Sequence, residues 1–278
     1  MAANFGIMQG RLLPPEAGRF QCFPRTRWPE EFPKAAQAGL DCIEWIYDLY
    51  GADANPLLTD AGTAEIQRLC ERHQVGVRSV CADYFMEQPL VRATPDQAEE
   101  RLTSLASLMG RCSVIGITRV VLPFVDASKL ESRGEIETLV PLLKRVLSDS
   151  EATDVEVHLE TSLAPEPFAF LLGLLPHPML KVNYDSGNSA SLGFHPRDEF
   201  GAYGDRVGSV HIKDRVLGGG TVPLGSGDVD FEALFEELDR MNYAGDFILQ
   251  VARGDPGAEV SLAIDSLAFV RGHLDVSS

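Results

Sequence analysis

Short apolar segments rich in β-branched residues alternate along the chain with longer segments of helical periodicity. We expect eight strands, at residues 5–12, 42–47, 76–82, 119–124, 156–160, 180–185, 208–213 and 247–251. Between residues 133 and 147, apolar side chains recur every three or four positions, which predicts an amphipathic helix. Strands that alternate with helices form parallel sheets, and eight such units close into a barrel. The pattern therefore predicts an α/β fold, a single (β/α)8 TIM barrel.

Residues that begin and end helices stand where this pattern requires them. Thr94 and Gln97 have the spacing of a capping box. Asp230 precedes another amphipathic segment, and Pro29 opens a segment that we expect to end at Gly39. The alternative fold is an open, doubly wound sheet. It is disfavoured because the turn after the first strand, MQGRLLPPE, lacks the glycine-rich phosphate-binding pattern of that class.

Length and composition fit one globular domain. The chain has 278 residues, and about 250 are typical of one complete barrel, so we expect residues 1–278 to form a single domain. No apolar segment approaches the roughly 20 residues of a membrane span, and the first residues lack the pattern of a secretory signal. The five cysteines include no CxxC pair, which is typical of reduced thiols. We therefore expect a cytoplasmic protein.

The formal net charge of −17 bears on the class of partner. Proteins that bind nucleic acid normally carry a basic surface, and the sequence has no basic stretch of this kind. The same acidity disfavours an anionic membrane surface. A small phosphorylated substrate stays compatible, because a few local Arg or Lys residues reverse the field inside a pocket. We expect a small-molecule partner, neither nucleic acid nor membrane, and the sequence leaves a homo-oligomer open.

Polar side chains stand at the ends of four consecutive predicted strands. In a TIM barrel the active site lies at the carboxyl ends of the strands, and alternate residues of a strand face the interior. This parity points four side chains into the same mouth: Glu160, Asp185, His211 and Gln250. Carboxylates so close together need a cation. A set of carboxylate, imidazole and amide ligands suits one divalent metal, namely Mn²⁺, Co²⁺, Mg²⁺ or Zn²⁺.

Four further polar residues of the predicted strand ends are candidates for binding substrate: Glu44, His158, Lys213 and Arg253. Glu44 and Lys213 point inward by parity, although a lysine paired with a buried carboxylate would follow the same pattern. Arg253 follows the last strand and suits an anionic end of a substrate, as would an ordinary surface arginine. His158 lies two residues before Glu160, a position that also suits a residue supporting a metal ligand.

The stretches HLET, NYDSGN, VHIKD and VPLGSGDVDFEALFEELDRMNYAGDFILQ resemble the sugar phosphate isomerase/epimerase family of xylose-isomerase-like TIM barrels. The earlier stretches GIMQGRL and AGLDCIEW are similar to the same family. Ketopentulose-phosphate 3-epimerases and hexulose-phosphate isomerases are the members that the chain resembles in particular. The resemblance implies that Glu160, Asp185 and His211 are three of the family's four metal ligands. The fourth position is Gln250, where many members have Glu.

The resemblance implies a divalent-metal-dependent isomerase or epimerase of a small sugar or sugar phosphate. Glu160 is then the catalytic base that removes a proton next to a carbonyl, which gives a metal-stabilised enediolate. The family's epimerases are implied to use two glutamates, and Gln250 cannot act as a carboxylate base. Two alternatives stay open for this reason: a metal-dependent dehydratase of a keto-polyol and a non-catalytic sugar-binding relative. A hydrolase of the AP-endonuclease type is disfavoured. It would need more metal ligands than the first four strand ends supply, and a basic face for DNA that this acidic chain lacks.

Overall fold

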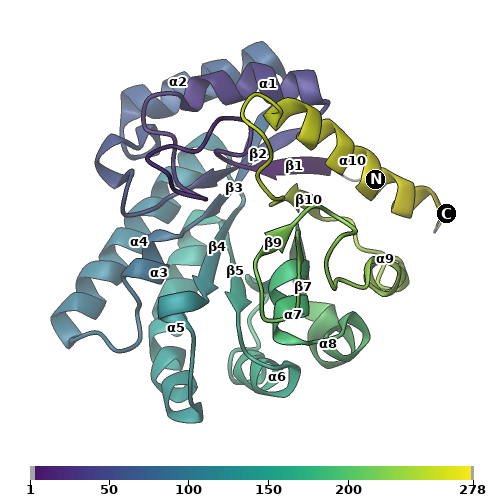
Figure 1. The fold of residues 1–278 in the computed structure, drawn as a ribbon. Helices are drawn as coiled ribbons and strands as arrows, with labels where there is room; N and C mark the ends of the chain where they lie inside the picture. Colours follow the sequence, from purple (N-terminus) through teal and green to yellow (C-terminus); the bar gives the residue numbers. More distant parts are fainter. Residues whose placement is uncertain (1–3, 277–278) are drawn as a thin grey trace.

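The computed structural model describes residues 4–276, within which eight parallel strands form a closed barrel surrounded by helices (Figure 1). Around the barrel the strands follow the order β1-β10-β7-β6-β5-β4-β3-β2. The predicted (β/α)8 TIM barrel is thus confirmed. The predicted domain, residues 1–278, also includes residues 1–3 and 277–278, which lie outside the described residues.

The barrel strands are β1 (Asn4–Met8), β2 (Cys42–Ile46), β3 (Gly76–Cys81), β4 (Arg119–Phe124), β5 (Glu156–Thr161), β6 (Leu180–Asp185), β7 (Val207–Ile212) and β10 (Asp246–Leu249). The α-helices are α1 (Glu31–Ala38), α2 (Asp60–His73), α3 (Tyr84–Glu87), α4 (Pro95–Ile115), α5 (Arg133–Thr153), α6 (Pro165–Leu174), α7 (Ser186–Leu192), α8 (Pro196–Tyr203), α9 (Phe231–Arg240) and α10 (Glu259–Val276). Short 3₁₀ segments are η1 (Trp28–Glu30), η2 (Ala52–Ala54), η3 (Pro56–Leu58), η4 (Asp126–Ser128) and η5 (Gly204–Arg206). A two-stranded sheet of β8 (Asp214–Arg215) and β9 (Thr221–Val222) follows β7.

The strand predictions hold for position and differ at the ends. The predicted strands at 119–124 and 180–185 match β4 and β6. The strand predicted at 5–12 is too long, because the chain leaves β1 after Met8 and turns at Gly10, whose φ is +81°. The apolar residues beyond that turn are buried in a loop rather than in a strand. Burial of the loop therefore explains an apolar pattern that resembles a longer strand.

The predicted helix boundaries follow the expected chemistry. Thr94 and Gln97 form the reciprocal capping box at the start of α4. Asp230 caps α9 by accepting a hydrogen bond from the backbone N–H of Ala233 at 2.9 Å. Gly39 ends α1 in the left-handed conformation. The helix predicted from residue 133 extends to Thr153, beyond the expected end at residue 147.

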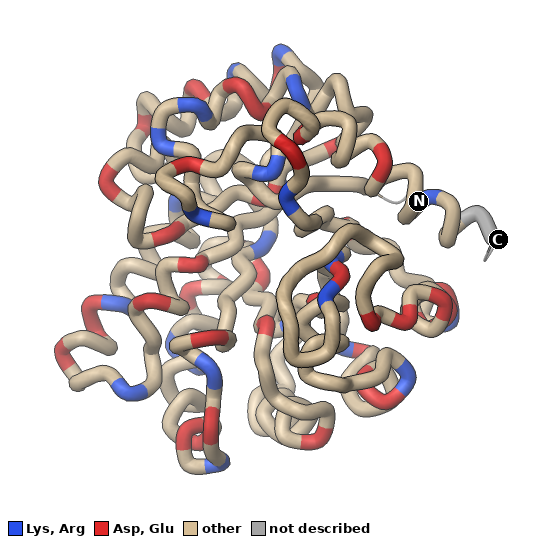
Figure 2. Tube along the Cα trace, viewed as in Figure 1, with Lys and Arg blue, Asp and Glu red and all other residues tan. Residues whose placement is uncertain are grey.

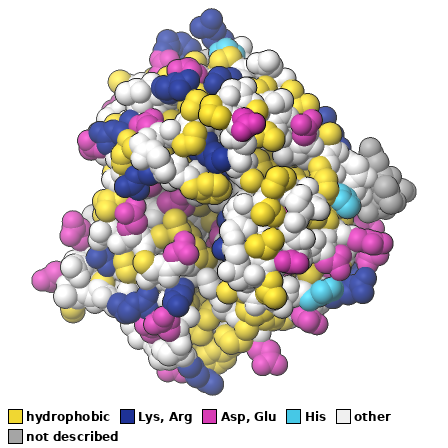
Figure 3. All heavy atoms as spheres, viewed as in Figure 1, with side chains coloured by type: hydrophobic (Ala, Val, Ile, Leu, Met, Phe, Trp, Pro, Cys, Tyr) yellow, Lys and Arg dark blue, Asp and Glu magenta, His cyan; other side chains and the backbone are white. Residues whose placement is uncertain are grey.

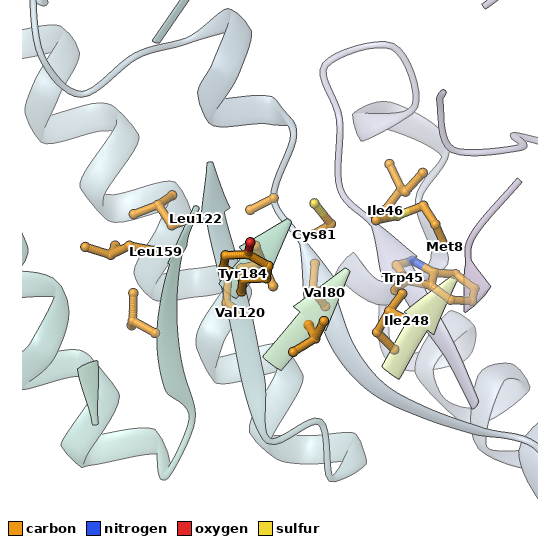
Figure 4. Packing of buried hydrophobic residues seen from close by; sticks show 14 of the residues in the cluster. Met8, Trp45, Ile46, Val80, Cys81, Val120, Leu122, Leu159, Tyr184 and Ile248 are labelled. Carbon is orange, nitrogen blue, oxygen red and sulfur yellow. The ribbon is translucent and has the colours of Figure 1, made fainter. Parts of the chain in front are cut away.

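Apolar side chains fill the layer between the strands and the helices. Figure 4 shows Trp45 of β2, Val120 and Leu122 of β4, Leu159 of β5 and Tyr184 of β6 among the residues of this core. All five are at most 2% exposed. Burial of apolar area contributes about 25 cal/mol per Å², so this layer is the main source of stability.

The barrel interior is polar at its amino-terminal end. Asp246 at the start of β10 accepts a hydrogen bond from Asn4 at 3.0 Å and pairs with Arg119 of β4 at 2.6 Å and with Arg78 of β3 at 3.2 Å. Arg119 is buried, so its charge depends on Asp246 for compensation. This cluster joins four strands across the bottom of the barrel and helps to close it.

Acidic and basic residues are interspersed along the described helices and loops (Figure 2). In the face that Figure 3 shows, charged side chains of both signs alternate with hydrophobic ones, without a continuous basic surface among the coloured residues. Within residues 4–276, none of the helices has the length and apolarity that crossing a membrane requires.

We predict that Asp246→Asn lowers the free energy of unfolding by about 3 kcal/mol, because it leaves the buried Arg119 without its partner charge. Urea denaturation followed by circular dichroism measures the change. Glu99→Gln is the control, because its pair with Arg145 is exposed and should leave the midpoint unchanged. Equal midpoints for the two variants would contradict the proposed role of Asp246.

Candidate active site

Three predicted ligand residues meet at the carboxyl ends of adjacent strands. Glu160 comes from β5, Asp185 from β6 and His211 from β7, and these strands are neighbours in the barrel. One ligand atom from each residue lies within 4.8 Å of the others, and all three side chains are buried. The structure therefore brings Glu160, Asp185 and His211 together as the sequence predicted. We call these three residues the triad.

Two asparagines hold the triad carboxylates in place. Asn183 Nδ2 donates to Glu160 Oε2 at 2.9 Å, and Asn188 Nδ2 donates to Glu160 Oε1 at 2.7 Å. The backbone N–H of Asn188 donates to Asp185 Oδ1 at 2.8 Å, so Asp185 also caps α7. Each carboxylate oxygen has more than one acceptor site, and these contacts orient the carboxylates without using all of their lone pairs.

His211 is oriented from beneath by Glu44 of β2. His211 Nε2 lies 2.6 Å from Glu44 Oε1, and Ser79 donates to the other oxygen of Glu44 at 2.6 Å. Burial alone would raise the pKa of Glu44, but His211, Arg119 and Ser79 together lower it. Glu44 is therefore ionised and holds the proton of His211 on Nε2.

The other ring nitrogen of His211 points at the triad carboxylates. Nδ1 lies 3.3 Å from Glu160 Oε2 and 3.9 Å from Asp185 Oδ2, and it makes no hydrogen bond with any described residue. Burial would lower the pKa of His211, but the charges of Glu44 and Glu160 outweigh it and raise this pKa to about 10. The position thus attracts a positive charge strongly, either a proton or a metal ion.

The donor set of the triad fits a divalent cation. One imidazole nitrogen and two carboxylates form a common set for catalytic metals, and it leaves coordination positions for a substrate. An orphaned, buried nitrogen beside two carboxylates is unfavourable unless a cation lies among them. Glu160, Asp185 and His211 are therefore the residues that would hold the metal.

The predicted fourth ligand, Gln250, is joined to Lys213. Gln250 Oε1 accepts a hydrogen bond from Lys213 Nζ at 2.8 Å, and Lys213 also donates to Asp185 Oδ2 at 3.3 Å and to Asn188 Oδ1 at 3.2 Å. Gly187 makes room for this lysine, since a Cβ there would lie 2.7 Å from Lys213 Cγ. Both side chains adjoin the triad, and the role of Gln250 as a metal ligand stays a prediction.

Glu44 and His158 were candidates for binding substrate, and the structure places both side chains inside the barrel, away from solvent. Each is fully buried below the triad. Glu44 contacts His211 and Ser79, while His158 is 2.7 Å from Ser209 through Nδ1 and 2.9 Å from Glu156 through Nε2. We therefore revise both roles. Glu44 supports a triad residue, and His158 belongs to the polar interior, where burial lowers its pKa.

Arg253 is also placed differently from the prediction. Its guanidinium donates to the backbone carbonyl oxygens of Gly10 at 2.7 Å, Leu13 at 2.6 Å and Phe20 at 3.0 Å. These contacts fix the long loop after β1. Arg253 therefore holds that loop, and it is not among the residues that line the cavity beside Glu160.

A cavity of about 710 Å³ opens above the triad. Glu160, Asn188, Lys213 and Gln250 line one part of its wall, and Gln21, Asp48 and Asp83 line another. Three cations also reach the cavity: Arg19, Lys129 and Arg215. The volume is in the usual range for small-molecule sites, and the mixed polar lining suits a hydroxylated ligand.

Asn188, Gln21 and Asp83 were not predicted as site residues. Asn188 lies in the stretch NYDSGN, three residues after Asp185, where an N-cap spacing signals its proximity. Asp83 comes directly after the predicted third strand, and this position at a strand end could have indicated a site residue. Gln21 lies in a loop, and the sequence offers no periodicity that places it.

The family model for xylose isomerase-like TIM barrels matches residues 32–272. The chain belongs to this family. An L-ribulose-5-phosphate 3-epimerase, UlaE, from Escherichia coli (strain ATCC 8739) is 34% identical over 260 residues, which cover 86% of this chain and 88% of the relative. UlaE of Shigella flexneri serotype 5b (strain 8401) is 25% identical over the same shares of the two chains. The resemblance found in the sequence is confirmed.

Solved structures of the xylose isomerase-like barrels extend the similarity of fold. One is IOLI protein with a binding zinc atom, which matches with a TM-score of 0.75 at 16% identity and covers 99% of this chain and 97% of that one. At this identity the match concerns the fold alone. The family assignment and the triad geometry are thus two separate observations.

We predict that Glu44→Gln weakens Mn²⁺ binding about 10- to 100-fold, because glutamine keeps the shape of Glu44 and removes the charge that orients His211. Isothermal titration calorimetry with MnCl₂ measures the affinity. Glu237→Gln, a change in a buried carboxylate on α9, is the matched control and should bind Mn²⁺ like the wild type. Unchanged affinity in Glu44→Gln would contradict the role of Glu44.

Proposed function

We propose that the protein is a metal-dependent epimerase or isomerase of a small keto-sugar or its phosphate. The observation that carries this proposal is the buried triad, of which Glu160 lines a polar cavity, with the Nδ1 of His211 directed at two carboxylates. The family assignment supports the same chemistry, because the UlaE relatives are named L-ribulose-5-phosphate 3-epimerases.

Glu160 is the proposed base. It lines the cavity, and Asn183 and Asn188 hold its two oxygens at 2.9 Å and 2.7 Å. A carboxylate fixed in this way is aimed at a substrate carbon without reorganisation of the site. A divalent cation bound by the triad would supply Lewis-acid stabilisation of the negative charge that develops on the substrate oxygens.

Lys213 and Asn188 are proposed to bind the oxygens of the substrate. Lys213 Nζ lies among Asp185, Asn188 and Gln250, and it faces the cavity. An ammonium group donates to hydroxyl or carbonyl oxygens, so it is suited to orient a polyol. Arg19, Lys129 and Arg215 are cations that can receive a phosphate at the same cavity.

Deuterium incorporation from D₂O tests the proposal. The wild-type protein with Mn²⁺ is incubated with L-ribulose, L-ribulose 5-phosphate and D-allulose, and NMR locates the exchanged carbon. We expect exchange next to the carbonyl of at least one ketose and its loss on chelation with EDTA. We expect Glu160→Gln to lower the exchange rate by at least about 100-fold, because it removes the base.

Glu166→Gln, on α6 outside the set of cavity residues, serves as the charge-matched control and should exchange at the wild-type rate. Exchange that persists in Glu160→Gln would contradict its assignment. Mn²⁺ binding without exchange into any of the three ketoses would instead favour a non-catalytic sugar-binding protein.

A further inference from the structure

Gln250 creates a chemical gap in the proposed function, on which this inference rests. Inversion at a carbon needs one group to remove a proton from one face and another to return a proton to the opposite face. Glu160 supplies one such group. Gln250 cannot supply the other, because a side-chain amide does not act as a general acid or base near neutral pH. A second carboxyl group on the cavity wall would fill the gap.

Asp83 is such a carboxyl group. It lies between β3 and α3, lines the cavity, and is only 7% exposed. Although it stands at the N-cap position of α3, its side chain makes no capping hydrogen bond. The conformation of the helix end therefore does not account for this buried carboxyl group.

Asp83 is connected to the position where the family usually has Glu. Gln21 Nε2 donates to Asp83 Oδ2 at 2.7 Å, and Gln21 Oε1 accepts a hydrogen bond from Gln250 Nε2 at 3.1 Å. One glutamine amide thus spans the space between Gln250 and Asp83. The carboxyl group of Asp83 lies at the far end of this bridge, on a part of the wall formed by other strands than those that carry the triad.

The other carboxyl groups at the cavity are less suited to the role. Asp48 accepts hydrogen bonds from the backbone N–H groups of Phe23 at 2.9 Å and Gly51 at 2.8 Å, so it holds two loops. Glu87 and Asp126 are more exposed to solvent. Among the described residues that line the cavity, Asp83 combines burial with side-chain partners that can move.

The environment of Asp83 suits a group that exchanges protons. Burial raises its pKa to about 6, and the charge of Glu160 acts in the same direction against the hydrogen bonds from Gln21 and Cys81. The Cys81 thiol lies 3.1 Å from Asp83 Oδ1 and stays protonated, because burial raises the pKa of Cys81. A carboxyl group with such a pKa is available in both protonation states near neutral pH.

We propose that Asp83 is the second acid–base residue and that the reaction is an epimerisation. Glu160 removes the proton from the carbon next to the carbonyl, and the electron pair of that C–H bond forms the enediolate. The Asp83 carboxylic acid then gives its proton to the other face of the same carbon, and the carbonyl is restored. Glu160 ends protonated and Asp83 ionised, and exchange with water resets both. In the reverse direction their roles are exchanged.

The test compares deuterium exchange from both epimers of the ketose that the wild type accepts, for example L-ribulose 5-phosphate and its C3 epimer. In Asp83→Asn with Mn²⁺, the epimer whose proton faces Glu160 should still exchange, and the other should not. We expect interconversion to fall by at least about 100-fold, and exchange from the first epimer by less than about tenfold. A residue that only supports the structure would affect both epimers equally.

Two further variants complete the test. Asp154→Asn removes a negative charge outside the set of cavity residues, in a left-handed conformation that Asn tolerates, and should leave interconversion unchanged. The double variant Asp83→Asn with Gln250→Glu returns a carboxyl group to the other end of the Gln21 bridge. We expect it to recover at least part of the lost interconversion.

The outcomes separate the two proposals. Interconversion at the wild-type rate in Asp83→Asn would overturn the role of Asp83 and leave the proposed function intact. Loss of exchange from both epimers, with unchanged unfolding and Mn²⁺ affinity, would also overturn it, because Asp83 would then bind substrate. A wild-type protein that exchanges no ketose would overturn the proposed function itself, and this inference with it.

Discussion

The hydrogen bond between Glu44 and His211 is the interaction on which the candidate site depends. Both side chains are fully buried, and the 2.6 Å contact joins an ionised carboxylate to the imidazole. It holds a proton on Nε2 and directs Nδ1 at Glu160 and Asp185. A buried carboxylate is costly unless its charge is compensated and its oxygens are hydrogen-bonded. Ser79 donates a hydrogen bond to Glu44, and the charge of Arg119 stabilises its ionised form. The orientation of His211 is therefore set by Glu44, Ser79 and Arg119, none of which is among the residues that line the cavity.

This arrangement extends along the axis of the barrel. Asp246 at the amino-terminal end pairs with Arg119, which donates to Ser79 at 3.3 Å, and Ser79 in turn donates to Glu44. Buried groups of opposite charge thus alternate from the bottom of the barrel to its mouth. Each depends on its neighbours for compensation, which couples the stability of the fold to the geometry of the site. Such a polar interior limits the energy that the barrel axis gains from apolar burial and leaves that contribution to the helix layer.

The fold and the triad could be predicted because each rests on a local pattern. The alternation of strands and helices indicated the barrel, and the parity of β5, β6 and β7 placed Glu160, Asp185 and His211 on one side of the strands. The alternation of residues along a strand shows which side chains face the interior, but not how far along the barrel axis they lie. Glu44 and His158 were therefore expected in the cavity, although they are buried below it.

Loop residues were less predictable for a different physical reason. The positions of Arg253, Gln21 and Asp83 depend on hydrogen bonds between segments far apart in the sequence, such as the contact of Gln21 with Gln250. No periodic pattern carries that information. Asp83 is the clearest example. The sequence showed that it follows a strand, but not that Gln21 connects it to Gln250.

Anomalous diffraction from crystals soaked in MnCl₂ tests the central claim most directly. The account predicts one strong manganese peak within bonding distance of His211 Nδ1 and of carboxylate oxygens from Glu160 and Asp185. A map without a peak at this position, with Nδ1 protonated and hydrogen-bonded to Glu160, would contradict it and would leave only the fold and the family assignment.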